Sequence, residues 1–128
     1  MTAADAIATI ATVLGRYVFR AADERSLQLQ VQAVLEHAAI RVSSEVPSAA
    51  GRYDLLAEFA GPVRLVLELK LAASAPAVER QAQRYALVPD VDGVVVVTSS
   101  NRLAHELRQP GTTELGGKPF GVIALRSF

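Results

Sequence analysis

The segment Val63-Arg64-Leu65-Val66-Leu67-Glu68-Leu69-Lys70 is the part of the chain from which the rest of the fold can be worked out. Its pattern is that of a β-strand, in which successive side chains point to opposite faces, so Glu68 and Lys70 share one face and Leu69 lies on the other. The strand is strongly apolar up to this charged end. Charged side chains in such an apolar strand are unfavourable unless they have a role. Glu68 and Lys70 are therefore candidate site residues.

Two further strand-like segments precede this one, Ile40–Val46 and Tyr53–Phe59. The link between them contains Pro47 and Gly51, and the link to the third segment is Ala60-Gly61-Pro62. Proline and glycine are typical turn residues. The three segments therefore predict an antiparallel meander.

Helices are predicted on both sides of the meander. Apolar residues at helical spacing predict helices over Ala3–Val18 and Asp23–Ala39, with Asp23 or its neighbour as the N-cap of the second. After the meander, a helix over Pro76–Leu87 leads to Val94–Val97, an apolar run typical of a strand buried on both faces. The predicted order ends with a helix over Asn101–Arg108, a loop over Gln109–Pro119 and a strand over Phe120–Leu125.

This order predicts an α/β fold with a mixed sheet, because a meander followed by a helical crossover into a buried strand needs both strand directions. The length of 128 residues predicts one domain over residues 1–128. Within it we expect the N-terminal helix in residues 1–20 and a core that carries the motifs over residues 23–99. A helix, a loop and a strand would fill residues 100–128.

Composition excludes several classes of site. The chain has no cysteine, which rules out disulfides, thiolate zinc sites and cysteine nucleophiles, and which fits a reducing cytoplasm. The Met1–Leu14 region is apolar but contains Asp5 and no leading basic cluster, which argues against a signal peptide. No apolar run is long enough to span a bilayer, so we expect no membrane partner. The net charge is zero, which argues against strong stand-alone DNA binding.

Asp54, Glu68 and Lys70 are the residues best suited to metal binding and catalysis. If the second and third strands form a hairpin, the carboxylates of Asp54 and Glu68 can converge on one ion, and Mg²⁺ or Mn²⁺ favours such hard oxygen ligands. A metal of this kind polarises a phosphodiester and activates water. The Lys70 ammonium could orient that water or stabilise the developing charge. Lys70 is one of only two lysines among 13 basic residues, so a lysine at this position stands out.

Three motifs in this order resemble the PD-(D/E)xK superfamily of restriction-endonuclease-like nucleases. They are Gly51-Arg52-Tyr53-Asp54, Glu68-Leu69-Lys70 and Gln81-Ala82-Gln83-Arg84-Tyr85. The last motif is similar to that of the Gln-x-x-x-Tyr branch, which includes RecB-like nucleases, and VRR-type nuclease domains are similar in size and order. The resemblance covers roughly Asp23 to Ser99. Tyr53 stands where proline is common in the superfamily.

The resemblance implies a Mg²⁺- or Mn²⁺-dependent endonuclease or exonuclease that acts on DNA, with a restriction-endonuclease-like core. It implies that Glu24, Asp54, Glu68 and the Leu69 carbonyl bind the metal. It also implies catalytic roles for Asp54, Glu68, Lys70, Gln81 and Tyr85. Gln81 and Tyr85, four residues apart on one helix face, would contact the phosphate backbone or brace Lys70. A domain this small suggests a homodimer, and by analogy a branched substrate.

Several alternatives remain open at the level of sequence. Asp54, Glu68 and Lys70 could form a cross-strand salt-bridge cluster, and Glu24 could be a first-turn acid favoured by the helix dipole. Gln81 and Tyr85 could be ordinary residues of a helix surface and core edge. For the whole protein, one alternative is an inactive binding or assembly module of the same fold, of phage or mobile-element type. Another is an immunity or regulatory partner of a larger protein.

Overall fold

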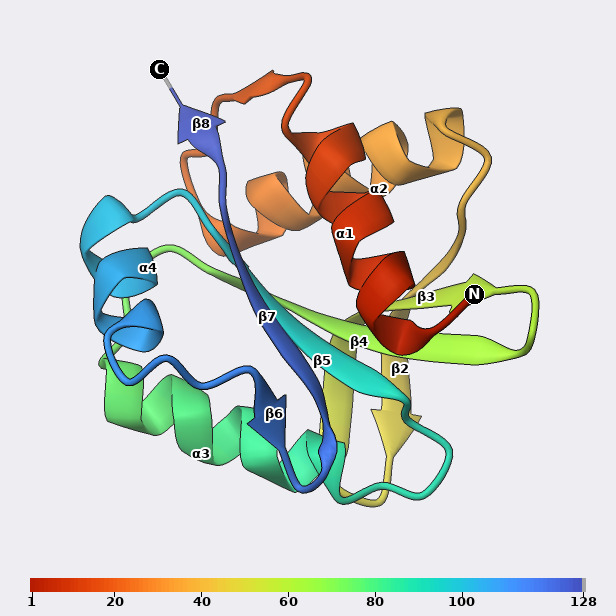
Figure 1. Cartoon of the computed structure of the whole chain (residues 1–128). Coiled ribbons are helices and arrows are strands. Elements are labelled where there is room, and N and C mark those ends of the chain that lie inside the picture. The colour runs from red at the N-terminus through yellow and green to blue at the C-terminus, as the bar shows by residue number, and fades with distance from the viewer. Residues whose placement is uncertain (128) are drawn as a thin grey trace.

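The computed structural model describes residues 1–127 and shows a twisted sheet between two layers of helices (Figure 1). The helices are α1 (Ala3–Leu14), α2 (Glu24–His37), α3 (Ala75–Ala86) and α4 (Asn101–Arg108). The strands are β1 (Val18–Phe19), β2 (Arg41–Ser48), β3 (Gly51–Phe59), β4 (Val63–Lys70), β5 (Gly93–Thr98), β6 (Glu114–Leu115), β7 (Lys118–Ala124) and β8 (Arg126–Ser127). Phe128, the last residue of the predicted domain, lies outside the described residues.

The main sheet has six strands in the order β2-β3-β4-β5-β7-β6. The first three form the predicted antiparallel meander. Helix α3 then carries the chain to β5, which lies parallel to β4, and α4 carries it to β7, which lies parallel to β5. The predicted α/β fold with a mixed sheet is therefore confirmed, and the short strands β1, β6 and β8 are added to the predicted order of elements.

Side-chain alternation along β4 divides the interior into two cores. Leu65, Leu67 and Leu69 pack in the core beneath α1 and α2, whereas Val66 packs in the core beneath α3 and α4. Every residue of β5 is buried, as its continuous apolar run predicts for a strand covered on both faces. Burial on both faces fixes the register of the central strands, because a slip of one residue would exchange the two faces.

The predicted N-cap of α2 is confirmed, and α4 begins with a similar cap. The Asp23 side chain accepts a hydrogen bond from the Ser26 N–H at 2.7 Å and caps α2. Ser100 caps α4 in the same way, by accepting from the Leu103 N–H. The cap on α2 matters for the site, because it fixes where the first turn of that helix lies.

Most element boundaries differ by one or two residues from the sequence-based expectation, and three differences have a clear structural cause. The first helix ends at Leu14 rather than Val18, and β1 follows because Val18 and Phe19 pair with β8. Strand β2 continues through Pro47, which an edge strand tolerates because its outer side has no partner. The expected loop over Gln109–Pro119 contains β6 and the start of β7, joined by two glycines with positive φ, as tight hairpins require.

Within residues 1–127, no helix combines the length and the apolar character that a membrane crossing requires.

Candidate active site

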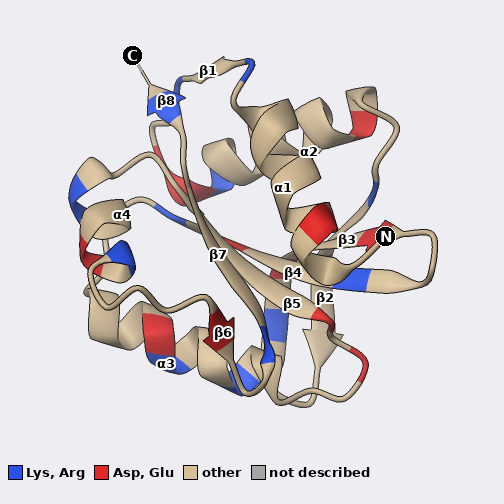
Figure 2. Ribbon diagram, viewed as in Figure 1, with Lys and Arg blue, Asp and Glu red and all other residues tan. Residues whose placement is uncertain are grey.

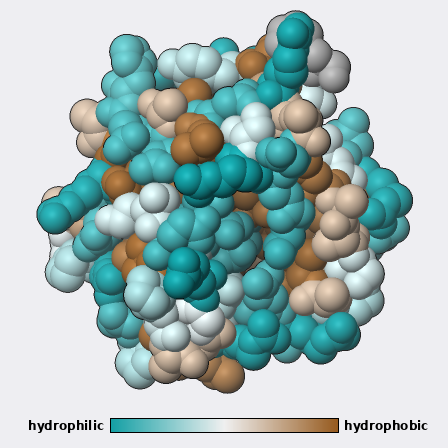
Figure 3. All heavy atoms as spheres, turned by 180° about the vertical axis from the view of Figure 1, so that it is seen from behind, coloured by the Kyte–Doolittle hydropathy of each residue, from teal (hydrophilic) through white to brown (hydrophobic). Residues whose placement is uncertain are grey.

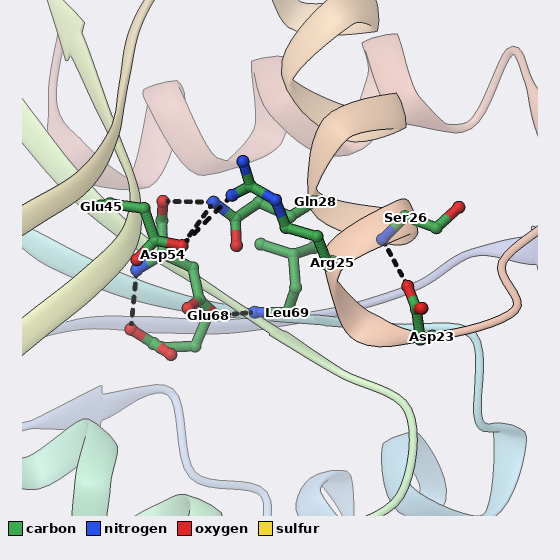
Figure 4. Close-up of polar contacts among 8 residues, drawn as sticks. All are labelled: Asp23, Arg25, Ser26, Gln28, Glu45, Asp54, Glu68 and Leu69. Atoms are coloured by element: carbon green, nitrogen blue, oxygen red, sulfur yellow. Dashed lines mark hydrogen bonds and ion pairs between the residues drawn. The ribbon is translucent and has the colours of Figure 1, made fainter.

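Asp54 and Glu68 meet where the ladder between β3 and β4 ends. The paired residues of these strands run only as far as Leu55 opposite Leu67. Beyond that pair, the Asp54 N–H donates to Glu68 Oε1 at 3.3 Å, and the Leu69 N–H donates to Asp54 Oδ2 at 2.9 Å (Figure 4). The two carboxylates thus hold the strands together where backbone pairing has stopped, and they lie side by side as the hairpin predicts.

Glu68 is almost fully buried, with 2% of its surface exposed. Burial raises the pKa of its carboxyl to about 9, the charge of neighbouring Asp54 acts in the same direction, and the charge of Lys70 opposes both. Glu68 is therefore neutral near pH 7 in the metal-free protein. A hard divalent cation would offset both the burial and the repulsion, so the chemistry of this pair fits such an ion.

Lys70 ends β4, half-buried and opposite Thr98 of β5. Within residues 1–127 its ammonium has no hydrogen-bond acceptor in the protein and no carboxylate within ion-pair distance, and all four ion pairs of this part of the chain are formed by arginines. This arrangement gives no support to the salt-bridge alternative for Lys70. A lysine without a protein partner beside two acids is available for a ligand.

Glu24 lies in the first turn of α2, at the end of β4. Its side chain is exposed, and Oε2 accepts a hydrogen bond from the Leu71 N–H at 3.2 Å. Glu24 thus contacts the residue that follows Lys70, and its expected role as a metal ligand stays a prediction. However, among residues 1–127 no three His, Cys, Asp or Glu side chains gather closely enough to hold a metal ion. The structure brings Asp54 and Glu68 together, and Glu24 binds the backbone next to them.

Gln81 and Tyr85 form a hydrogen-bonded chain from α3 to β3. Gln81 Nε2 donates to the Tyr85 hydroxyl at 3.1 Å, and that hydroxyl donates to the Arg52 carbonyl at 3.2 Å. The pair therefore supports β3 two residues before Asp54. The sequence had suggested a different contact for Gln81 and Tyr85, either Lys70 or the phosphate backbone of the substrate. Burial raises the pKa of the Tyr85 hydroxyl, and the nearby charge of Glu68 adds to that shift.

The tyrosine pair also shapes the entry to β3. The rings of Tyr53 and Tyr85 pack edge to face, with centroids 5.0 Å apart and planes at 86°. Gly51 lies against the Tyr85 ring with φ +128, a conformation that residues with a side chain rarely adopt. The Gly51-Arg52-Tyr53-Asp54 motif is thus explained by local backbone conformation and packing.

Sequence reasoning missed three residues around Asp54. Gln28 Nε2 donates to the Asp54 carbonyl at 3.1 Å and to Glu45 Oε1 at 3.2 Å, and Arg25 lies 3.4 Å from the same Glu45 oxygen (Figure 4). Gln28 carried a usable signal, because it is a polar residue on the buried face of α2, one turn after Glu24. Glu45 carried none, since its role depends on a left-handed backbone conformation with φ 53.

The structure is similar to the crystal structure of a repair endonuclease from Pyrococcus abyssi. The two superpose with a TM-score of 0.51 at 14% sequence identity, over 84% of this chain and 50% of the endonuclease chain. This chain therefore spans about half the length of that protein. No protein-family model matches the sequence, and no curated protein matches it. At this level of identity the likeness shows a shared fold and nothing more.

Proposed function

We propose that this protein is a metal-dependent nuclease of the PD-(D/E)xK type, which hydrolyses phosphodiester bonds of DNA. The observation that carries the proposal is the interlocked pair of Asp54 and Glu68 at the open end of β4, with Lys70 two residues further on. The fold that the chain shares with a repair endonuclease supports it. Two adjacent acids, and a lysine that forms no ion pair within residues 1–127, lie at one end of β4. This arrangement suits hydrolysis better than it suits structural support.

Asp54, Glu68 and the Leu69 carbonyl would hold the cation, Mg²⁺ or Mn²⁺, with Glu24 as a further carboxylate at the edge of the site. A cation bound there would supply positive charge to the scissile phosphate and lower the pKa of a bound water. Glu68 must lose its proton to take part, because a protonated carboxyl is a poor ligand. The site is therefore set up to exchange a proton for a cation.

Lys70 would act on the water and the phosphate. Its ammonium has no competing acceptor in the described part of the chain, so it is free to donate hydrogen bonds to a phosphate oxygen or to the attacking water. In the reaction water attacks phosphorus, a bridging P–O bond breaks, and the departing oxygen takes up a proton. A fixed positive charge beside that phosphate stabilises the charge that develops in the transition state.

The balance of charges leads us to infer that one copy binds DNA weakly. Basic and acidic residues are interspersed over the ribbon in Figure 2, in line with 13 of each in the sequence. The opposite face, in Figure 3, is mostly hydrophilic, and hydrophobic side chains reach its surface in separate places. Affinity for DNA depends on clustered positive charge. We therefore infer that a homodimer provides the DNA-binding surface, and that branched DNA, with its two strands to cut, is a suitable substrate.

The proposal is tested by incubating the purified protein with supercoiled, linear and branched DNA in Mg²⁺, in Mn²⁺ and in EDTA. Cleavage that needs the cation and disappears in Asp54→Ala is expected. Accumulation of nicked or linear plasmid would indicate an endonuclease, and loss of end-labelled nucleotides an exonuclease. Absence of cation-dependent cleavage on all three DNA forms would refute the proposal.

The second candidate function is an inactive binding or assembly module of the same fold, of phage or mobile-element type. Its support is the neutral net charge and the lack of a three-acid cluster in residues 1–127. A calorimetric Mn²⁺ titration separates the two functions. A nuclease should bind the ion with heat that is lost in Asp54→Ala, whereas a module without a metal site should show no such heat.

A further inference from the structure

Asp54 is held in place by side chains instead of by neighbouring strands. The register between β2 and β3 skips the position where Glu45 faces Asp54, and the ladder between β3 and β4 begins only at Leu55. The Asp54 N–H donates to Glu68, and its carbonyl accepts from Gln28. The residue at the centre of the site therefore has no ladder partner on either side, and its backbone depends on these two contacts.

Gln28 is well suited to fix that backbone. It is 4% exposed and is the one polar residue among the buried positions of α2. Its Nε2 has two hydrogens, and it donates to two acceptors, the Asp54 carbonyl and Glu45 Oε1. Both neighbours can only accept hydrogen bonds, so the amide must present its nitrogen to them, and its orientation is determined.

Glu45 completes this support from the edge strand. Its backbone is left-handed, with φ 53, which is unfavourable for a residue with a side chain. Such conformations persist where surrounding contacts enforce them. Here Arg25 and Gln28 both hold the carboxylate, and Figure 4 shows all three side chains converging beside Asp54. The cluster links α2 to β2 and β3 at the one position where these strands are not paired.

We propose that Gln28 is a positioning residue of the site. By holding the Asp54 carbonyl, it keeps the Asp54 carboxylate on the Leu69 N–H and beside Glu68, where the two acids can share a cation. In this role Gln28 would act through Asp54, to whose carbonyl it donates, and would not itself bind the cation. Its importance for cation binding and cleavage rests on the proposed function, whereas its effect on the position of Asp54 does not.

The test compares two identical substitutions on one helix, Gln28→Met and Gln30→Met. Gln30 also bonds the backbone, at the Arg20 carbonyl, but makes no hydrogen bond to the site. Amide hydrogen exchange, measured by NMR, should become about tenfold faster or more at Asp54 and Leu69 in Gln28→Met, while the amides of β5 keep their protection. Gln30→Met should leave exchange at Asp54 and Leu69 unchanged. A purely structural role of Gln28 would speed exchange throughout the sheet.

Calorimetry with Mn²⁺ then tests the consequence for the site. Gln28→Met should bind Mn²⁺ about 10- to 100-fold more weakly than the wild type, as expected when a residue that supports a ligand is lost. Glu45→Ala is the second variant, because its side chain is 39% exposed and its removal leaves Gln28 with one acceptor. This variant should show a smaller change in the same direction.

The outcomes separate the two hypotheses. Unchanged exchange at Asp54 and Leu69 in Gln28→Met, or in a folded Glu45→Ala if the former does not fold, would overturn the positioning role. A wild-type protein that binds no Mn²⁺ would overturn the proposed function. In that case local acceleration of exchange at Asp54 and Leu69 would still support the positioning role.

Discussion

The Asp54 carboxylate accepts the Leu69 N–H at 2.9 Å, directly after the last backbone pair between β3 and β4. A side chain from one strand thus takes the place of a backbone partner for the next strand. The Asp54 N–H bonds Glu68 in return. These two hydrogen bonds bring both carboxyl groups into the gap between the strands. There Glu68 is buried beside the charge of Asp54, which raises its pKa.

The stability of the metal-free protein should fall as pH rises, because of Glu68. Its pKa is about 4.5 in the unfolded chain and about 9 in the folded protein, so between these values the folded state holds a proton that the unfolded state has released. The stabilisation is complete below about pH 4.5 and is lost as the pH rises through about 9. Urea unfolding in EDTA from pH 5 to pH 9 measures this decline.

Glu68→Gln should remove most of that pH dependence. The amide is neutral at every pH and can still accept the Asp54 N–H through its oxygen. At pH 8 the variant should be more stable than the wild type, by on the order of a few kcal/mol, although it should not cleave DNA. Glu36→Gln, an exposed glutamate of α2, is the control and should keep the wild-type slope. Equal slopes in wild type and Glu68→Gln would contradict the raised pKa.

Binding of Mn²⁺ should release a proton near pH 7. Glu68 is protonated in the metal-free protein and must be deprotonated to hold the ion, so about one proton is expected per ion bound. Calorimetry in buffers with different ionisation enthalpies measures this number. The release should be absent in Glu68→Gln, and a binding heat independent of the buffer in the wild type would argue against Glu68 as a ligand.

The stability of the protein should respond differently to loss of the hydroxyl of Tyr53 and of Tyr85, whose rings pack edge to face. Tyr85→Phe removes the bond to the Arg52 carbonyl and should cost about 0.5–1.5 kcal/mol of stability, with a reduced cleavage rate. Tyr53→Phe is the matched control, because the Tyr53 hydroxyl is buried and has no hydrogen-bond partner in the described residues. It should be neutral or stabilising. If thermal unfolding shows Tyr53→Phe to be the more damaging change, the proposed brace by Tyr85 is wrong.

Much of the fold could be predicted from the sequence, because its signals are local. The alternation in β4, the apolar run of β5 and the capping residues each specify an element without knowledge of its neighbours. The boundaries that differed depend on context. Whether Pro47 ends a strand depends on whether the strand is at an edge of the sheet, and β1 forms because β8 lies beside it.

The site divides in the same way. The nearness of Asp54 to Glu68 follows from a short hairpin, and the spacing of Glu68 and Lys70 from strand geometry, so both were predictable. The contacts of Gln28 and Glu45 arise where the ladder skips Asp54, and no residue pattern marks such a break. Gln81 and Tyr85 were found by their spacing, but their contact with the Arg52 carbonyl depends on how α3 packs on the sheet.

We propose above all that Asp54, Glu68 and Lys70 form one hydrolytic site. Its most direct test is the single-turnover rate of DNA cleavage in Mg²⁺ for Lys70→Ala against Lys118→Ala. Lys118, the other lysine of the chain, donates to the Val88 carbonyl at 2.6 Å and is the control. We expect Lys70→Ala, still folded and still binding Mn²⁺, to cleave about 10²–10³-fold more slowly, while Lys118→Ala keeps the wild-type rate. Equal rates in Lys70→Ala and wild type would contradict it.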